Sequence, residues 1–442
     1  MVPASLLDII GWPVRRRLSA LNRRPDAHLD PQRTRYLMPA PTLAGGRRSS
    51  CFLFCLALSL MVPLMNSSAP TPLYPFYKEQ FDLSALDLTL IFGAYGIGVL
   101  IALVAMARIA GSVSDLRRLF VPASLLVLVG AAAFAHGTSL GPLCAARLLA
   151  GLGSGVMTAA VNVALVRFNP GHNDKLPALV ATLAMVSGLA LGPLVSGAAL
   201  QLELRPLASP FWLIAALGLA SAVATLILWP SRAASDAAAP TPENTRPASL
   251  RQALRGIGLP FHLCAWSVFF SWSFAACVFV IGPQVAQQVF GLEDRGVFGY
   301  VICAYLLIAG MSQLYCQRLD ARQALLSGWL CQCLTLLILL LACYSQALYL
   351  ALPGLAIGGY AYGALFVGNA RLVNQLAPRH SHGKLIAYFY ATVYLFNATP
   401  VPLGLLVDAC GIVTASNVAL GLFLVIGLGL FALARRTRFA AR

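Results

Sequence analysis

The sequence predicts an all-α polytopic membrane protein, with twelve transmembrane helices arranged as two pseudo-symmetric six-helix bundles. Three observations lead to this fold class: the composition, the long apolar segments and the placement of the basic residues. Of the 442 residues, 59% are hydrophobic and only 10% are charged, whereas a soluble domain carries about 25% charged residues. This composition excludes a soluble enzyme and a disordered chain. The long apolar runs also do not fit the short alternating strands of a transmembrane barrel.

Twelve apolar segments approach the length of about 20 residues that a helix needs to cross the hydrocarbon core. We expect the spans near residues 51–72, 88–108, 119–137, 141–166, 177–200, 210–230, 260–286, 297–316, 324–344, 347–370, 385–407 and 411–434. An even number of spans places both termini on the same side of the membrane.

The basic residues separate to the two sides of these spans. The net charge is +16, and alternating the loops places 27 Lys and Arg on one side. The other side holds three, Lys78, Arg205 and Arg295, and Arg147 alone lies inside a span. Because basic residues collect on the cytoplasmic side, both termini are predicted to be cytoplasmic. The positive charge therefore indicates topology, and nucleic-acid binding is not expected.

Polar segments divide the chain into two bundles. We assign 51–230 to an N-terminal six-helix bundle, 231–259 to an Ala- and Pro-rich cytoplasmic linker, 260–434 to a C-terminal six-helix bundle and 435–442 to a cytoplasmic tail. The second half echoes the first, because Tyr95 precedes Asp115 by 20 residues and Tyr300 precedes Asp320 by 20. This duplication is typical of transporters.

Residues 1–50 are rich in Arg and Pro and too polar to span a membrane. They are expected to form a disordered, basic cytoplasmic tail. Three explanations remain open: a tail near anionic lipid, an interfacial helix broken at Pro13, or a start codon assigned too early. The third is favoured, because a start at Met38 would leave a tail of ordinary length.

The loop between the second and third spans contains a candidate gate. It reads Gly111-Ser112-Val113-Ser114-Asp115-Leu116-Arg117-Arg118. Glycine lets two helix ends approach closely, and Asp115 can accept hydrogen bonds from a helix start and pair with Arg. Gly111, Asp115, Arg117 and Arg118 are therefore candidate gating residues that would hold the cytoplasmic side shut. The simpler alternative is a basic loop with a helix cap.

Arg147 opens the segment Arg147-Leu-Leu-Ala-Gly151-Leu-Gly153-Ser-Gly155 in the fourth span. It lies roughly 10 Å deep at about 1.5 Å per residue, where a charge costs about 2.5–3.5 kcal/mol on translocon scales. It therefore needs water, a carbonyl or a carboxylate beside it, unless it extends outward to the interface.

Small residues and prolines mark two further spans. In the fifth, Gly188, Gly192 and Ser196 recur every four residues, and Pro193 bends the helix. We expect Gly188, Gly192, Pro193 and Gly197 to form a tight contact with a facing helix. The first span ends in Asn66-Ser67-Ser68-Ala69-Pro70-Thr71-Pro72, where prolines stop the helix and free carbonyls, which is tolerable beside a cavity.

These motifs resemble those of the major facilitator superfamily (MFS), and within it the bacterial drug:proton antiporter-like branch. The loop is similar to G-x-L-A-D-R-x-G-R-K but two residues shorter after Asp115. The fourth span resembles R-x-x-x-G-x-G, and the fifth resembles G-x-x-x-G-P-x-x-G-G with Ser196 replacing one glycine. The resemblance covers about residues 51–434. It implies the MFS fold in a bacterial inner membrane, a role for Arg147 in proton coupling, and export.

Acidic residues are nearly absent from the span interiors. The candidates for proton coupling are therefore Arg147, Asp115 and Asp408, although Asp408 could simply cap a loop. Aromatic and uncharged polar side chains at cavity depth suit a neutral, weakly cationic or amphipathic aromatic compound. The candidate cavity residues are Asn66, Tyr95, Asn162, Trp266, Trp272, Gln284, Tyr305, Tyr360, Asn369, Tyr390 and Asn397.

We predict a monomeric secondary active transporter that works by alternating access and couples protons to the efflux of small amphipathic or aromatic compounds. Its partners would be substrate, protons and the lipid bilayer. No cofactor or metal is expected, because the eleven cysteines show no C-x-x-C pattern and no Walker motif is present. The alternatives are uptake of a small metabolite, a lipid-modifying membrane enzyme using the cluster His380-Ser381-His382, and a transporter-like sensor.

Overall fold

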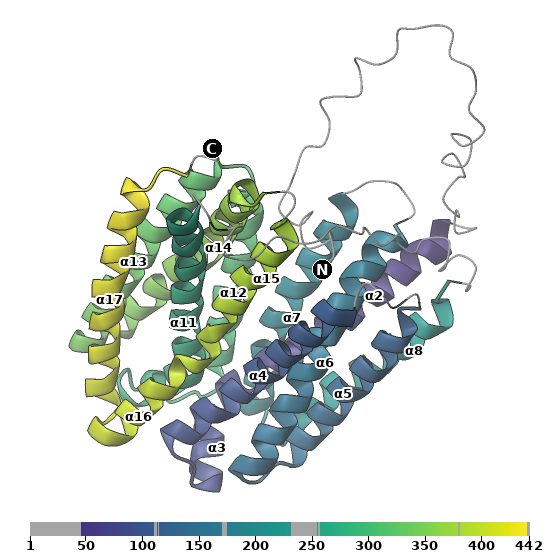
Figure 1. Ribbon diagram of the computed structural model, residues 1–442. Helices are drawn as coiled ribbons and strands as arrows, with labels where there is room; N and C mark the ends of the chain where they lie inside the picture. Colours follow the sequence, from purple (N-terminus) through teal and green to yellow (C-terminus); the bar gives the residue numbers. More distant parts are fainter. Residues whose placement is uncertain are drawn as a thin grey trace, which may run out of the picture.

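A computed structural model describes residues 46–109, 113, 115–169, 175–230, 254, 257–378 and 381–439, and its regular secondary structure is helical (Figure 1). Within this part of the chain, twelve helical segments are long and apolar enough to cross a membrane. The predicted span count and all-α class are therefore confirmed. Of the predicted tail over 1–50, residues 1–45 lie outside the described residues, as do nearly all of the linker and the candidate gate residue Gly111. Residues 46–50 are not part of a disordered tail, because they form the start of the first helix (Gly46–Ser68).

The first half of the molecule comprises six spans on one side of Figure 1. Its elements are α2 (Gly46–Ser68), η2 (Thr71–Leu73), α3 (Tyr74–Phe81), α4 (Ala85–Ile109), α5 (Arg117–His136), α6 (Leu140–Arg167), α7 (Lys175–Gln201) and α8 (Ser209–Leu228). The mean hydropathy of its span windows lies between 1.7 and 2.3, so apolar length, rather than an amphipathic stripe, defines these helices.

The second half follows the same order of spans and lies beside the first. Its elements are α11 (Gly258–Gln288), α12 (Val297–Cys316), α13 (Ala321–Ser345), α14 (Leu348–Leu376), α15 (His382–Tyr394), η4 (Leu395–Ala398), α16 (Pro400–Cys410) and α17 (Ile412–Arg436). The third span of each half begins beside an aspartate that accepts from a backbone N–H two residues later. Asp115, which precedes the N-cap Leu116, accepts from Arg117 at 3.0 Å, and Asp320, itself the N-cap, accepts from Arg322 at 3.1 Å. The sequence echo at these two positions thus marks equivalent helix starts.

Two spans are interrupted, the first at the proline-rich end that the sequence indicated and the eleventh where the sequence predicts a continuous helix. In the first span, Pro70 has no N–H to donate to the Asn66 carbonyl, so α2 ends at Ser68 and the chain continues through η2 into α3. The eleventh span is interrupted by η4, and Pro400 then starts α16 with its fixed φ angle. Both breaks coincide with prolines, and both lie where the two halves meet.

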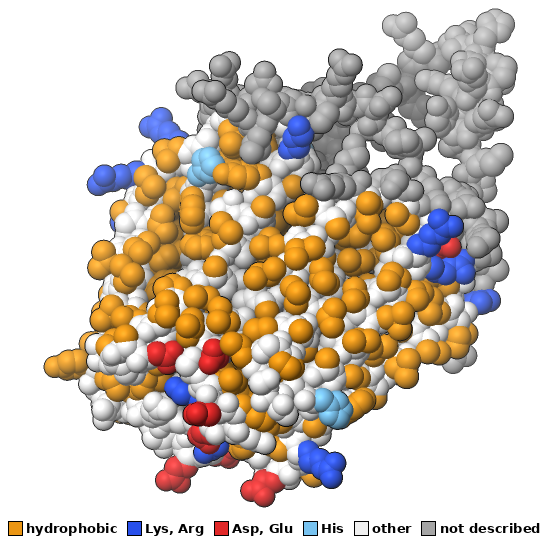
Figure 2. Space-filling view, turned by 60° about the horizontal axis from the view of Figure 1, so that its bottom comes forward, with side chains coloured by type: hydrophobic (Ala, Val, Ile, Leu, Met, Phe, Trp, Pro, Cys, Tyr) orange, Lys and Arg blue, Asp and Glu red, His pale blue; other side chains and the backbone are white. Residues whose placement is uncertain are grey.

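Acidic side chains gather at one end of the bundle, which we call the acidic end; the opposite end, where Asp115 and Asp320 lie at helix starts among arginines, is the basic end. The acidic end lies at the bottom of Figure 1 and comes forward in Figure 2. It carries Glu79, Asp82, Asp87, Glu203, Glu293, Asp294 and Asp408. The flanks between the two ends are mainly apolar (Figure 2), as a lipid-facing surface requires.

A small buried cluster that includes Ala190 of α7 and Ile302 and Tyr305 of α12 joins the two halves along these two helices, and the larger shared core lies at the acidic end. One buried cluster there joins Tyr77 and Leu88 of the first half to Ile281 and Val407 of the second. Towards the basic end, each half has a separate cluster, around Phe120 in the first half and around Trp329, Phe261 and Phe389 in the second. In Figure 1 the halves also approach each other at the acidic end and separate towards the basic end.

Candidate functional site

Arg147 is the only charged side chain that is buried among the described residues, with 2% of its surface exposed. Its Nη1 donates to the carbonyl oxygens of Asn66 at 3.2 Å and Ser67 at 3.0 Å. These carbonyls end α2, and the one at Asn66 is freed by Pro70. A positive charge therefore caps the negative end of a helix dipole. The sequence predicted water, a carbonyl or a carboxylate beside Arg147, and the structure places two carbonyls there. The alternative that Arg147 extends outward to the interface is wrong, because its side chain is buried.

Tyr95 of α4 forms the second wall around this guanidinium. The Arg147 Cζ lies 4.7 Å from the centre of the Tyr95 ring, a cation–π geometry. The Tyr95 hydroxyl donates to Ser154 Oγ of α6 at 2.7 Å. Gly151 allows this arrangement, since a Cβ there would overlap the Tyr95 carbonyl oxygen. Three helices of the first half thus converge on Arg147.

The glycines of α7 contact two helices rather than one. A Cβ at Gly188 would overlap the Met61 carbonyl of α2, and one at Gly192 would lie 2.5 Å from the Met65 carbonyl oxygen. At the acidic end, a Cβ at Gly197 would lie 2.6 Å from the Gly296 carbonyl oxygen, beside α12 of the other half. The predicted motif therefore packs α7 against the helix end that Arg147 caps and also joins the two halves.

Aromatic rings of the second half form a cluster that faces this region. Trp272 of α11 stacks on Tyr362 of α14 with centroids 5.7 Å apart, and packs against Phe366 at 5.4 Å. Tyr394 and Phe396 approach the same indole edge-on at 6.3 and 5.4 Å. All five rings are half-buried, so part of their surface stays available.

The halves are held together at the acidic end by polar contacts. Asp408 of α16 accepts from the backbone N–H groups of Ala85 and Leu86, both at 2.9 Å, and so caps the start of α4. Arg295 pairs with Glu79 at 2.8 Å, and Gln201 donates to Asp294 at 2.7 Å. Every one of these contacts joins the first half to the second, and together with the shared core they close this end.

Comparison with known proteins identifies this architecture. Residues 56–399, well over half of the chain, match the family model of the major facilitator superfamily. The chain belongs to the major facilitator superfamily. No curated protein sequence matches it, so the match gives the superfamily and no branch within it.

Solved MFS structures share the fold at low identity. A bacterial homolog of the human lysosomal transporter Spinster, inward-facing and unoccupied, is 14% identical, with 89% of this chain and 98% of that chain covered and a TM-score of 0.70. A peptide transporter POT is 17% identical, with 93% and 99% covered and a TM-score of 0.68. A nucleoside transporter, NupG, is 11% identical, with 87% and 99% covered and a TM-score of 0.66.

Membership in the MFS makes the chain a multi-pass secondary transporter of small molecules, not an enzyme. The alternative of a lipid-modifying enzyme is therefore discarded. His382 begins α15, and His380 lies outside the described residues, so the cluster that supported that alternative is only partly visible.

The described residues of the candidate gate contact only residues of the first half. Asp115 accepts from the Arg117 backbone and pairs with the Arg117 Nε at 3.3 Å. Arg117 also lies over the Trp229 ring at 5.9 Å, and Arg118 is exposed. No contact of these residues with the second half is found within the described part of the chain. Asp115 binds a backbone N–H at the start of α5 but is not its N-cap, which is Leu116, so its contacts are closer to the simpler alternative than to a gate.

The structure gathers some of the predicted cavity residues and separates others. Asn66, Tyr95, Trp272, Tyr305 and Asn397 lie around the region between Arg147 and the aromatic cluster, with Tyr305 packed on Tyr362 at 6.0 Å. The remaining candidate cavity residues lie in other surroundings.

Asn162 and Asn369 turn back to carbonyls of their own helices, and the Tyr360 hydroxyl bonds to Ser327 at 3.1 Å. Trp266 is 44% exposed and touches Phe269, and Tyr390 packs on Phe389. Gln284 is 1% exposed, and neither amide atom finds a partner among the described residues.

The sequence analysis missed Tyr362, Phe366, Tyr394 and Phe396. Tyr362 and Phe366 are four residues apart on α14. Aromatic side chains at that spacing share a helix face, and this spacing was the available signal.

We expect Gly192→Ala to destabilise the protein. The new Cβ would lie 2.5 Å from the Met65 carbonyl oxygen and 2.9 Å from the Ala69 nitrogen. Backbone atoms cannot rotate away, so the cost is that of overpacking, about 1–3 kcal/mol. The detergent-solubilised variant should therefore melt several degrees below the wild type. Gly421→Ala is the matched control, because a Cβ there meets nothing within 4 Å; equal melting temperatures for both variants would contradict the contact.

Proposed function

We propose that this MFS chain is a proton-coupled exporter of small amphipathic, aromatic compounds that works by alternating access. The observation that carries the proposal is the unequal joining of the two halves. The larger shared core and several polar contacts lie at the acidic end, a smaller shared cluster follows α7 and α12, and each half has a separate core towards the basic end. Such a molecule can open and close at its two ends in turn.

The orientation follows from charge. Basic side chains cap and flank helices at one end, and acidic side chains gather at the other (Figure 2). Because basic residues are retained in the cytoplasm, we take the basic end as cytoplasmic, with both termini on that side. The structure would then represent an inward-facing state with its outer end closed.

The substrate class follows from the groups that face the region between the halves. Trp272, Tyr362 and Tyr394 offer ring faces and edges, which favour flat or weakly cationic compounds. No described carboxylate lies at this depth, since the acidic residues all sit at the two ends. Arg147 is occupied by two carbonyls and a ring, so its charge is not available to bind an anion.

The proposal of proton coupling rests on the antiporter-like motifs and on the depth of the candidate residues in the membrane. Asp115 lies at the basic end of the bundle and Asp408 at the acidic end. Protonation of either residue can affect closure of its own end, but neither residue alone can carry a proton across the membrane. Arg147 lies inside the membrane beside the end of α2, but an arginine keeps its proton and so does not itself carry the coupled proton. We therefore assign Arg147 a positioning part in coupling, and we assign Asp408 to closure of the outer end.

Transport in proteoliposomes tests the proposal. With ethidium as the aromatic probe and an imposed pH gradient, we expect flux that depends on the gradient and reverses when the gradient is reversed. A protonophore and protein-free vesicles are the controls. Absence of gradient-dependent flux across a panel of amphipathic dyes and drugs would contradict proton-coupled export. Movement of the probe in the same direction as protons would instead favour uptake.

We expect Asp408→Asn to loosen the outer end by roughly tenfold in the closed-to-open ratio. An asparagine retains one acceptor oxygen, so one of the two bonds to α4 and the charge–dipole attraction are lost. The separation of fluorescent noncanonical residues placed at Leu204 and Val413 should therefore increase. Asp87→Asn is the control, because Asp87 lies in the first turn of the same helix but accepts from the Ser84 N–H of its own half at 2.9 Å; an equal response of both variants would contradict the assignment.

A further inference from the structure

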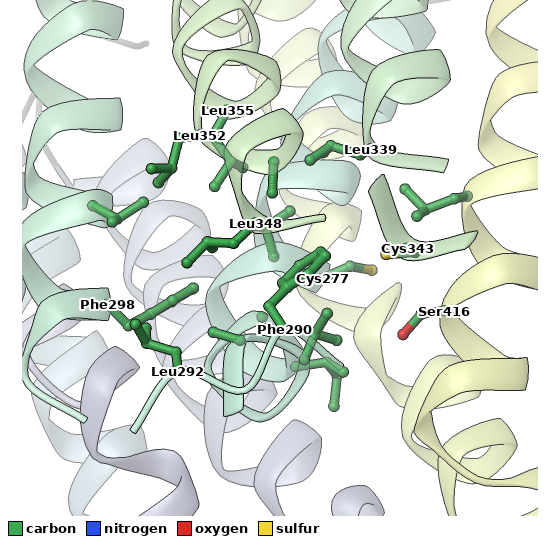
Figure 3. Close-up of a pocket in the computed structure, with 18 of the residues that line it drawn as sticks. Cys277, Phe290, Leu292, Phe298, Leu339, Cys343, Leu348, Leu352, Leu355 and Ser416 are labelled. Carbon is green, nitrogen blue, oxygen red and sulfur yellow. The ribbon is translucent and has the colours of Figure 1, made fainter. Parts of the chain in front are cut away.

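A cavity lies inside the second half, away from the region between the halves. It has a volume of about 160 Å³ and is enclosed by α11, α12, α13, α14, α16 and α17 near the acidic end (Figure 3). Phe274, Phe298, Leu339 and Leu355 are among the side chains that form its wall. Neither Arg147 nor any ring of the aromatic cluster around Trp272 contributes to it, so it is distinct from the proposed transport region.

The wall of this cavity carries almost no polar group. Ser416 supplies the only side-chain hydroxyl, Cys277 and Cys343 supply thiols, and the remaining side chains are aliphatic or aromatic. An ordered water needs two to four polar partners, and an apolar cavity of about 150 Å³ stays dry and accepts benzene. The cavity therefore suits a small hydrocarbon group, and it is too small and too apolar for a whole amphipathic compound.

The cavity reaches the flank of the molecule between α12 and α14. Leu352 of α14 lines it and is 45% exposed, and Val297 and Val301 of α12 line it while half-buried. These side chains lie on membrane-spanning helices, so the opening faces the hydrocarbon of the bilayer. The available occupant of matching chemistry at this depth is an acyl chain.

We propose that this cavity holds the end of a phospholipid acyl chain from the leaflet at the acidic end. The chain enters sideways between α12 and α14 and packs against Phe298 and Leu355. Val297 and Phe298 are neighbours of Gly299, whose Cα faces Gly197 of α7 in the other half. The bound chain thus supports α12 from behind, at the point where α12 closes against α7. This inference does not depend on the identity of the substrate.

Photo-crosslinking tests the proposal without any transport measurement. The protein is reconstituted with phosphatidylethanolamine that carries a diazirine at the end of one acyl chain, and adducts are mapped by mass spectrometry. We expect adducts on cavity residues of α11, α12 and α14. A lipid with the diazirine next to the headgroup should not label them. Adducts confined to exposed side chains such as Val425, or equal labelling of the cavity by both lipids, would overturn the proposal.

A substitution that fills the cavity, compared with a matched substitution outside it, provides a second test. Ala351 lines it and is buried, so Ala351→Phe should lower cavity adducts by about tenfold. Leu428→Phe adds a ring at a 50% exposed site of α17 outside the cavity, and it should leave the adducts unchanged. Equal adduct yields in the two variants would overturn the assignment. If Ala351→Phe does not fold, the comparison of the two lipids on the wild-type chain decides whether the cavity holds the end of an acyl chain. Because no flux is measured, failure here is distinct from failure of the proposed export.

Discussion

Arg147→Gln is expected to abolish gradient-driven transport, with a loss of at least tenfold in proteoliposome flux. The glutamine cannot supply the two charged hydrogen bonds from Nη1 to the Asn66 and Ser67 carbonyls, and it lacks the contact with the Tyr95 ring. Each buried carbonyl left without a donor costs about 1–3 kcal/mol, so the end of α2 should loosen. The measurement is initial flux, together with the melting temperature of the same preparation.

Arg147→Lys separates a structural role from a role in coupling. Lysine keeps the charge but lacks the planar fork that reaches two carbonyls while stacking on a ring. If Arg147 serves only to cap α2, a Lys variant that melts like the wild type should transport normally. If it takes part in coupling, flux should become less dependent on the pH gradient even in a stable variant. Wild-type gradient-driven flux in Arg147→Gln would contradict both roles.

The span count could be predicted from the sequence because it depends on composition and length alone. A run of about 20 apolar residues must satisfy its backbone polar groups by forming a helix, whatever surrounds it. The carbonyls at Asn66 and Ser67 could also be anticipated as unpaired, since Pro70 removes a donor from the same helix. The break of the eleventh span at η4 was missed, although Pro400 and Pro402 mark it, because the local apolar pattern continues through it.

Contacts between helices distant in sequence could not be predicted in the same way. Asp408 looks like a loop cap in isolation, and only the fold brings it to the start of α4, more than 300 positions earlier. The side chains of the aromatic cluster around Trp272 come from α11, α14, α15 and η4, and each ring alone resembles a lipid-facing residue. Gating by Asp115 and Arg117 needs a partner in the other half, and this conformation shows only contacts of these residues with each other and of Arg117 with Trp229, all within the first half.

Gly96→Ala is expected to disfavour the conformation seen here and to lower transport about tenfold or more. A Cβ at Gly96 of α4 would overlap the Cγ and Cβ of Asn397, which lies in η4 of the other half. Rotation about the first side-chain torsion moves the Asn397 amide but not its Cβ, so the two segments must separate. Overpacking of this kind costs about 1–3 kcal/mol, which corresponds to a shift of about 5- to 150-fold in the balance of the two conformations.

The position of the clash also predicts its rescue. The three atoms nearest to the added methyl all belong to the Asn397 side chain, so Asn397→Gly should restore flux to Gly96→Ala although each change alone is harmful. Such non-additivity is the signature of a direct contact. Gly93→Ala is the matched control one turn away on α4, because its Cβ would lie 3.4 Å from the Asn397 carbonyl oxygen, an ordinary distance. If the effects of the two single changes simply add, the contact does not limit transport, and closure of the acidic end must depend on Asp408 and on the approach of α7 to α12.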